Sequence, residues 1–139
     1  MKLKIATILA AATMATAGFA ESHGASGDAE AGAKVFNKCK ACHMIEDASG
    51  NAIVKGGKTG PNLYGVAGRQ AGSVDGFRYG DSIVAAGEAG LVWDEESFSG
   101  YVVDPKGFLA EYLDDSGAKA KMAKQRLKPE DLANVYAYL

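Results

Sequence analysis

The sequence predicts an all-α domain in which short helices are joined by long loops. Apolar residues recur at helical spacing in several separate segments, and no strand-like alternation persists beyond a few positions. The 139 residues include 18 glycines, which interrupt regular structure often. The apolar heptads of a four-helix bundle are missing as well. Short helices and many loops indicate a small chain that is packed around a cofactor.

The run Cys39-Lys40-Ala41-Cys42-His43 is the most informative motif of the chain. It contains both cysteines of the sequence and one of its two histidines. Two thiols three positions apart, with an imidazole directly after the second, are typical of a c-type haem attachment site. Positions i, i+3 and i+4 share one face of a helix. One helical turn can therefore bond both haem vinyl groups and place an imidazole on the iron.

Two other interpretations of the cysteine pair are weaker. A disulfide across two intervening residues would make a thiol redox site, and a zinc ion would need two more good ligands. The chain has no further cysteine, and its other histidine, His23, lies in a stretch rich in glycine and serine. We therefore expect haem rather than thiol chemistry or zinc.

The first twenty residues have the features of a secretory signal peptide. A short basic start precedes an apolar, alanine-rich run from Ile5 to Ala17, and Ala20 closes a small-x-small cleavage site. A membrane anchor is the alternative, but this run is short for a bilayer span. We predict a signal peptide over residues 1–20, a flexible leader over 21–27 and one compact domain over 28–139.

Charge is distributed unevenly along the chain. Without the signal peptide, the chain carries 13 basic and 17 acidic residues, which argues against nucleic acid as a partner. Residues 34–69 carry six basic and two acidic residues, and residues 119–128 carry five basic residues and no acid. Residues 75–115 carry ten acids and two bases. This segregation indicates an electric dipole rather than an ordinary charged surface, and its basic segments flank the expected haem ligands.

The first helix is predicted from Ala29 to Lys40, directly before the haem motif. Asp28 is a suitable N-cap, and apolar residues and the two cysteines then recur at helical spacing. Gly32 lies on the same face as Phe36, where a glycine costs about 0.5–1 kcal/mol relative to alanine. Close approach of another helix would explain that cost.

A surface loop is predicted from Met44 to Gly60. A turn follows at Thr59–Leu63, and then a short helical turn at Asn62–Val66. The Pro61 carbonyl in this region can accept a hydrogen bond. A buried imidazole on iron needs such an acceptor for its second ring nitrogen.

Four more helices are predicted in the second half of the chain. A short helix over 81–86 precedes one over 95–103, which starts with an aspartate N-cap and acids in its first turn. A proline ends that helix and starts the next, over 105–113. The last helix covers 129–139. Its apolar pattern is still running at the final residue without a C-cap signal, so we expect a few further native residues.

A ligand for the second face of the haem must come from elsewhere in the chain. The two methionines of the signal peptide are removed, and Met44 directly follows His43 and cannot reach the opposite face. Met122 lies far along the chain, beside lysine and alanine residues that rarely form a hydrophobic core. Packing in the core therefore explains the presence of a methionine here less well than ligation of the iron does. We predict Met122 as the ligand, with His23, a lysine or an open site as the alternatives.

Taken in order, four groups of residues closely resemble a class I cytochrome c. They are Gly32-x-x-x-Phe36-x-x-Cys39-x-x-Cys42-His43, Thr59-Gly60-Pro61-Asn62-Leu63, Lys121-Met122 and Ala137-Tyr138-Leu139. The resemblance covers essentially the whole chain after the signal peptide and is nearest to the periplasmic cytochromes c of purple photosynthetic and denitrifying bacteria. It implies the class I cytochrome c fold, with short helices and loops wrapped around one covalently attached haem c.

The resemblance also implies the roles of five residues at the iron and the haem periphery. Cys39 and Cys42 would form the thioether links. His43 and Met122 would be the two axial ligands. The carbonyl of Pro61 would accept the hydrogen bond from the ring N–H of His43.

Four more residues match positions that surround the haem in this family. Arg69, Tyr79 and Trp93 match groups that neutralise or hydrogen-bond a buried propionate. Tyr101 matches a tyrosine beside the axial methionine. The alternative for Tyr79 and Trp93 is a purely structural role as aromatic residues of the core.

Two departures from the family pattern lie close to Met122. Ala120 stands where a threonine is frequent, so a hydroxyl that could bond a propionate is missing. Lys124 stands where an aromatic residue is usual. We therefore expect a more polar and open haem edge here, which bears on the strength of the Fe–S bond.

A haem iron with both axial positions filled by protein cannot bind a substrate, but it can change oxidation state with little rearrangement. We therefore predict a soluble, monomeric one-electron carrier of the periplasm rather than an enzyme. The resemblance implies a cytochrome bc complex as donor and a photosynthetic reaction centre, a terminal oxidase or a nitrogen-oxide reductase as acceptor. Lysines near the haem edge would dock transiently on these membrane complexes. The alternatives are a peroxidase-like enzyme or gas sensor with an open haem site, and a thiol-disulfide protein.

Overall fold

The computed structural model describes residues 24–139, which are mostly helical and loop. The elements in chain order are α1 (Ala29–Val35), the 3-10 helix η1 (Phe36–Lys38), β1 (Ile45–Glu46), β2 (Ala52–Val54), α2 (Asp81–Glu88), α3 (Glu95–Val103), α4 (Pro105–Leu113) and α5 (Pro129–Tyr138). Residues 1–23, with the predicted signal peptide and His23, lie outside the described range. Within 24–139, no helix has the length and apolar character needed to cross a membrane.

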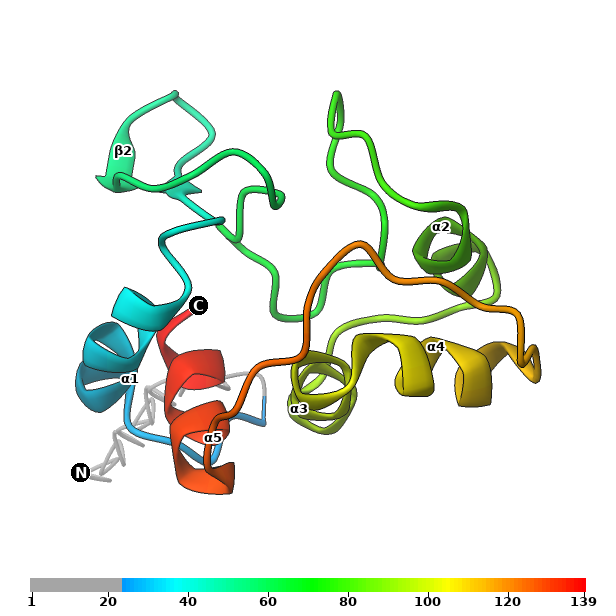
Figure 1. Ribbon diagram of the computed structural model, residues 1–139. Coiled ribbons are helices and arrows are strands. Elements are labelled where there is room, and N and C mark those ends of the chain that lie inside the picture. The colour runs from blue at the N-terminus through cyan, green and yellow to red at the C-terminus, as the bar shows by residue number, and fades with distance from the viewer. Residues whose placement is uncertain (1–23) are drawn as a thin grey trace, which may run out of the picture.

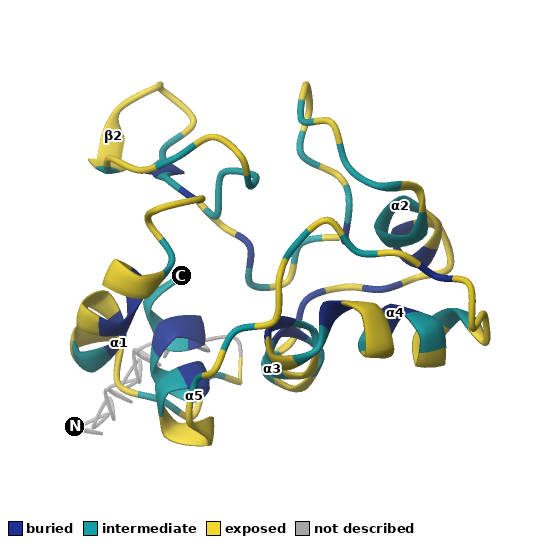
Figure 2. Cartoon of the chain, viewed as in Figure 1, coloured by how far each residue is buried: buried dark blue, intermediate teal, exposed yellow. Residues whose placement is uncertain are grey.

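The helices form two groups that are connected by long loops (Figure 1). One group is α1 beside α5, and the other is α2, α3 and α4. Buried side chains from both groups form one core, and its largest members include Phe36, Trp93, Phe98, Leu109 and Tyr136. Figure 2 shows that the buried parts of α1 and α5 lie where these two helices meet.

Close backbone contact joins α1 to α5. A Cβ atom at Gly32 would lie 1.9 Å from the carbonyl oxygen of Asn134, so a side chain does not fit at this crossing. Beside it, the rings of Phe36 and Tyr138 pack with their centroids 5.9 Å apart. The structure confirms the prediction that Gly32 allows another helix to approach.

Local capping sets the bounds of α3 and α4. The side chain of Asp94 accepts from the N–H of Ser97, and the Ser97 hydroxyl accepts from the N–H of Asp94, which makes a capping box. The Asp104 carboxylate caps α4 by accepting from the N–H of Gly107, and Pro105 is the first residue of that helix. Both helices have the predicted bounds, whereas α2 extends to Glu88, beyond its predicted end.

Two predicted helical segments are shorter than expected. The first helix ends at Val35 rather than Lys40, and the chain continues as the tighter η1. The predicted helical turn at 62–66 is not formed, and only a turn at Tyr64–Gly65 is present. Gly65 has a φ of +65°, a left-handed conformation that a helix does not contain.

The predicted loop from Met44 to Gly60 contains a small antiparallel hairpin of β1 and β2. Its turn is held by the Asp47 carboxylate, which accepts from the N–H groups of Ser49 and Asn51 at 2.9 Å each. Gly50 occupies the left-handed position of this turn, with a φ of +82°. The Asp-Ala-Ser-Gly-Asn run at residues 47–51 is a sequence signal for this turn. The strands on either side are too short to show an alternating pattern.

The end of the predicted leader is packed on the helices. The N–H of Ser26 donates to the Glu95 carboxylate on α3 at 2.7 Å. The N–H of Asp28 donates to the side-chain oxygen of Asn134 on α5 at 2.8 Å. A Cβ atom at Gly27 would lie 2.2 Å from the Ala133 carbonyl. These contacts extend the α1–α5 unit toward the N-terminus, whereas residues 21–23 of the leader lie outside the described range.

Replacing Gly32 tests the helix crossing directly. Gly32→Ala should lower the free energy of unfolding by about 1–3 kcal/mol, because the added methyl group overlaps the backbone of α5. The matched control is Gly100→Ala in α3, where the new Cβ would meet only the Phe108 ring, at 3.1 Å. Chemical denaturation of both variants measures the difference, and equal losses would contradict the proposed steric cause.

Candidate haem site

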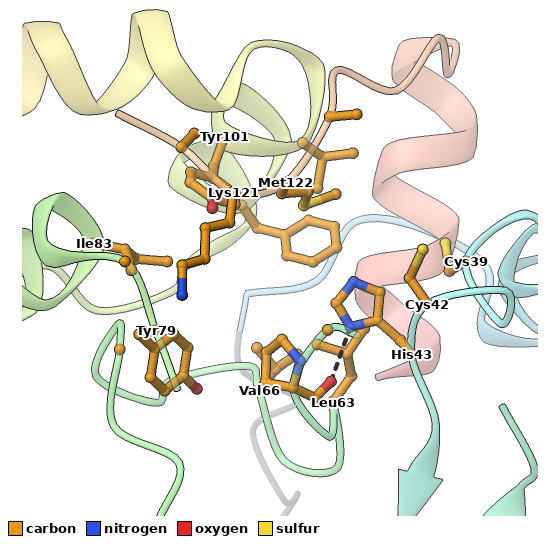
Figure 3. A pocket seen from close by; sticks show the side chains of 18 of the residues that line it. Cys39, Cys42, His43, Leu63, Val66, Tyr79, Ile83, Tyr101, Lys121 and Met122 are labelled. Carbon is orange, nitrogen blue, oxygen red and sulfur yellow. Dashed lines mark hydrogen bonds between the residues drawn. The ribbon is translucent and has the colours of Figure 1, made fainter. Parts of the chain in front are cut away.

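One cavity of about 350 Å³ lies between the two groups of helices and the loops that connect them. Figure 3 shows Met122 and Lys121 on one side of it, and His43, Leu63, Val66 and Tyr79 on the other. All nine site residues predicted from the sequence line this cavity: Cys39, Cys42, His43, Pro61, Arg69, Tyr79, Trp93, Tyr101 and Met122. The fold therefore brings together residues that are distant in the sequence.

The two cysteines and the histidine belong to one helical turn. The N–H groups of Cys42 and His43 donate to the Cys39 carbonyl at 3.1 and 3.0 Å. This turn places both thiols and the imidazole on the cavity wall, as the spacing predicts. Both thiols are free, and burial raises the pKa of Cys39.

Glycines hold the segment 56–60 against this turn. The N–H of Gly57 donates to the Lys40 carbonyl at 2.9 Å, and the N–H of Gly60 donates to the Cys42 carbonyl at 2.8 Å. A Cβ atom at Gly60 would lie 2.3 Å from Cε1 of the His43 ring. The imidazole is therefore packed directly against backbone, and only glycine leaves room for it.

The position of His43 favours one tautomer of its ring. Its Nδ1 lies 2.8 Å from the Pro61 carbonyl oxygen, which can only accept a hydrogen bond. Nδ1 therefore carries the proton, and the lone pair of a neutral ring is on Nε2. Burial lowers the pKa of His43, which favours this neutral form, although the Pro61 carbonyl opposes the shift. The ring can therefore offer Nε2 to a metal.

Arg69 brings a half-buried and incompletely satisfied cation to the cavity. Its Nη1 donates to the Tyr64 carbonyl at 3.0 Å, and its Nη2 donates to the Asn62 carbonyl at 3.2 Å. Its Nε is buried without a partner. Burial lowers the pKa of Arg69, while the nearby Tyr79 opposes that shift. A buried N–H with no acceptor is costly, so this position fits a ligand with an anionic or polar group.

Aromatic residues from three segments form another part of the wall. The Trp93 and Tyr101 rings pack with centroids 5.0 Å apart, and burial raises the pKa of Tyr101 to about 12. The Tyr79 hydroxyl accepts from the N–H of Val74 at 3.2 Å. Trp93 is fixed by backbone bonds, because its N–H donates to Arg69 and its carbonyl accepts from Gly68. This wall holds Tyr101 in its neutral form.

Sequence reasoning missed several apolar residues that line the cavity. They come from the loop before α2 and from α2, α3 and α4: Leu63, Val66, Ile83, Phe98, Val102 and Leu109. Phe98 and Val102 lie four positions apart on α3, which is the spacing of one helix face, so helical periodicity carries a signal for burial. Periodicity does not distinguish a side chain that faces the core from one that faces a cofactor.

The chain is similar over most of its length to bacterial cytochromes c. The family model "Cytochrome c" matches residues 29–139. Cytochrome c-551 of Roseobacter denitrificans is 59% identical over an alignment of 140 positions, which covers 100% of this chain and 94% of the relative. The crystal structure of cytochrome c2 from Rhodobacter sphaeroides has a TM-score of 0.78 and 52% identity, and the match covers 81% of this chain and 94% of that one.

The chain belongs to the cytochrome c family. A second structure, ferric cytochrome c-550 from Paracoccus versutus, has a TM-score of 0.75 and 52% identity over 81% of this chain and 95% of that one. These matches confirm the predicted fold class and the predicted relationship to proteins of purple photosynthetic and denitrifying bacteria. They also confirm the cofactor, since this family carries one covalently attached haem c in electron transport.

The residues of the cavity fit such a cofactor. Its wall is largely apolar, as a flat macrocycle requires, and the unpartnered Nε of Arg69 suits an anionic substituent. The thiols of Cys39 and Cys42 and the Nε2 of His43 lie on this wall and are donor groups that could hold the cofactor. Within residues 24–139, no group of three or more histidine, cysteine or acidic residues could hold a metal ion.

Arg69 can be tested separately from the cofactor ligands. Arg69→Lys keeps the positive charge but cannot reach the carbonyls of Asn62 and Tyr64 together. The free energy of unfolding of the haem-loaded protein should fall by about 1–3 kcal/mol, because at least one of the two hydrogen bonds made by the charged guanidinium is lost. Arg126→Lys, at an exposed residue, is the control and should change it little. Similar losses in the two variants would refute a specific role for the two hydrogen bonds of the Arg69 guanidinium.

Proposed function

We propose that this protein is a one-electron carrier of the periplasm whose haem c is linked to Cys39 and Cys42. His43 and Met122 would hold the haem iron in this proposal. The observation that carries it is that one cavity is lined by His43 from the attachment turn and by Met122 from the loop before α5. The two side chains lie on different sides of that cavity (Figure 3). With both ligands supplied by the protein, the haem iron would have no position for a substrate, so the protein would act as a carrier rather than an enzyme.

The haem supplies an iron that takes up and releases one electron at a time. The protein's own contribution is to keep the surroundings of that iron constant. Pro61 fixes the ring of His43, and Gly60 packs against it. Trp93 and Phe98 are nearly fully buried and keep water away. A rigid, mostly dry site changes little between oxidation states, and a thioether ligand favours the reduced one.

Arg69, Tyr79 and Trp93 are proposed to hold a haem propionate. The support is that all three line the cavity and that Arg69 Nε has no protein partner. The positive charge of Arg69 would stabilise a buried carboxylate, and Tyr79 could donate its hydroxyl proton. Tyr101 would lie beside the Met122 ligand.

Lysines at the cavity are proposed to dock on acidic membrane complexes. Lys38, Lys119 and Lys121 line the cavity, and all three are exposed. Most acids of the domain lie in a different part of the chain, residues 75–115. The donor would be a cytochrome bc complex, and the acceptor a reaction centre, a terminal oxidase or a nitrogen-oxide reductase. The carrier would act as a monomer, because transient docking requires a free surface.

Carbon monoxide tests the assignment of the methionine ligand. Met122→Ala should let the ferrous protein bind carbon monoxide, because one axial position is then open. Met44→Ala is the matched control, since Met44 does not line the cavity. Absorption spectra of both variants and of the unchanged protein measure binding. Identical binding in all three would show that Met122 is not the ligand.

Charge reversal tests the docking surface. Lys119→Glu should slow electron transfer to acceptor membranes by about twofold to tenfold at low ionic strength, with a smaller effect at high ionic strength. Lys106→Glu is the control, because Lys106 is exposed on α4 and does not line the cavity. Stopped-flow kinetics with the reduced protein provide the rates. A salt-independent effect, or an equal effect of Lys106→Glu, would rule out steering by the cavity lysines.

A further inference from the structure

We infer that the ion pair between Lys124 and Asp104 is a latch that holds the Met122 loop in place. This inference rests on the proposed role of Met122 as a haem ligand and concerns how firmly that ligand is held. The latch loop is defined as residues 119–125, which contain no helix or strand. Lys124 and Asp104 act as positioning residues, because neither lines the cavity.

Specific polar contacts hold the latch loop on both sides of Met122. Before Met122, the N–H of Lys119 donates to the Ser82 hydroxyl at 3.0 Å, and Nζ of Lys121 donates to the Arg78 carbonyl at 3.0 Å. After it, the N–H of Gln125 donates to the Val102 carbonyl at 3.0 Å. The residues directly after Met122, Ala123 and Lys124, are exposed. Apolar burial therefore does not anchor this part of the loop.

The Lys124 side chain supplies the missing anchor. Its Nζ lies 3.1 Å from Oδ1 of Asp104, the residue that separates α3 from α4. The same carboxylate accepts from the N–H of Gly107 at 3.1 Å. A Cβ atom at Gly107 would lie 2.4 Å from the Asp104 carboxylate, so this carboxylate lies directly against the first turn of α4. Lys124 therefore pairs with a carboxylate that is already held in place. Forming the ion pair then costs less side-chain conformational entropy.

The state of Asp104 agrees with this role. Its pKa is lowered, first by the N–H of Gly107 and then by the bond to Lys124, so the carboxylate is ionised at neutral pH. The Lys124 side chain is 68% exposed and that of Asp104 is 42% exposed. An exposed pair has a modest strength, so its loss should let Met122 leave the iron roughly two- to fivefold more often. The protein thereby holds its ligand with a charge pair at a position where the family usually has an aromatic ring.

Two substitutions separate the latch from the cap of α4. Asp104→Asn removes the charge but keeps a good N-cap residue. Lys124→Gln removes the other charge. Lys128→Gln is the matched control, because Lys128 is exposed and no ion pair is recorded for it in residues 24–139. Imidazole is added to the ferric, haem-loaded proteins, and its binding rate at saturation reports how often the methionine leaves.

Both latch variants should bind imidazole roughly two- to fivefold faster at low ionic strength, and the double variant should be no faster than the single ones. A long-range electrostatic effect on the iron would change the imidazole binding rate in opposite directions in the two variants, because one variant loses a negative charge and the other loses a positive charge. The differences should shrink at high ionic strength. Unchanged rates, additive effects or an equal effect of Lys128→Gln would overturn the latch.

Absorption spectra of the same ferric proteins distinguish a failure of the latch from a failure of the proposed function. Thioether ligation gives ferric haem a weak long-wavelength absorption band. If the unchanged protein lacks this band, Met122 is not the ligand, and the proposed function and the latch both fail. If the band is present and the latch variants exchange at the wild-type rate, only the latch fails.

Discussion

Backbone contact between the attachment turn and the segment 56–61 is the constraint on which the rest of the site depends. Gly57 and Gly60 donate to the turn, Gly60 leaves no space beside the ring, and the Pro61 carbonyl fixes Nδ1. Because backbone atoms make these contacts, the ring has almost no freedom to rotate. A cofactor bonded to this turn would be fixed at one edge, and the other loops would pack around it.

The opposite side of the cavity is built in a different way. Met122 lies in a loop without regular structure, and the loop is tied to α3 by Gln125 and to the helix caps by Lys124. These ties are single hydrogen bonds and one exposed ion pair, which are individually weak. The two candidate ligands are therefore held unequally. The histidine belongs to the part of the fold that backbone contacts hold, and the methionine belongs to a loop that fewer and weaker contacts hold.

Local signals explain which elements could be predicted from the sequence. Caps and prolines define α3 and α4, since Asp94, Asp104 and Pro105 act on residues within one turn. The haem motif and the lone distant methionine are likewise visible without any tertiary information. The hairpin of β1 and β2 escaped prediction because strands of two and three residues have no measurable period. The bonds of Arg69 to two carbonyls depend on the path of the loop, which no local pattern encodes.

The replacement of an aromatic residue by Lys124 shows how a departure from a family pattern acquires a physical meaning. The sequence indicates only a more polar haem edge. The structure adds that Lys124 bonds to Asp104 and is therefore partly withdrawn from the group of lysines that could dock. Lys121 is similarly engaged with the Arg78 carbonyl. In the proposed docking and latch, the basic charge near Met122 would have two uses. It would hold the loop, and it would set the field that an acidic partner meets, so a substitution of either lysine would change both. Lys119 is the better probe of docking for this reason, since Lys38 also forms an ion pair, with Asp131 at 3.8 Å.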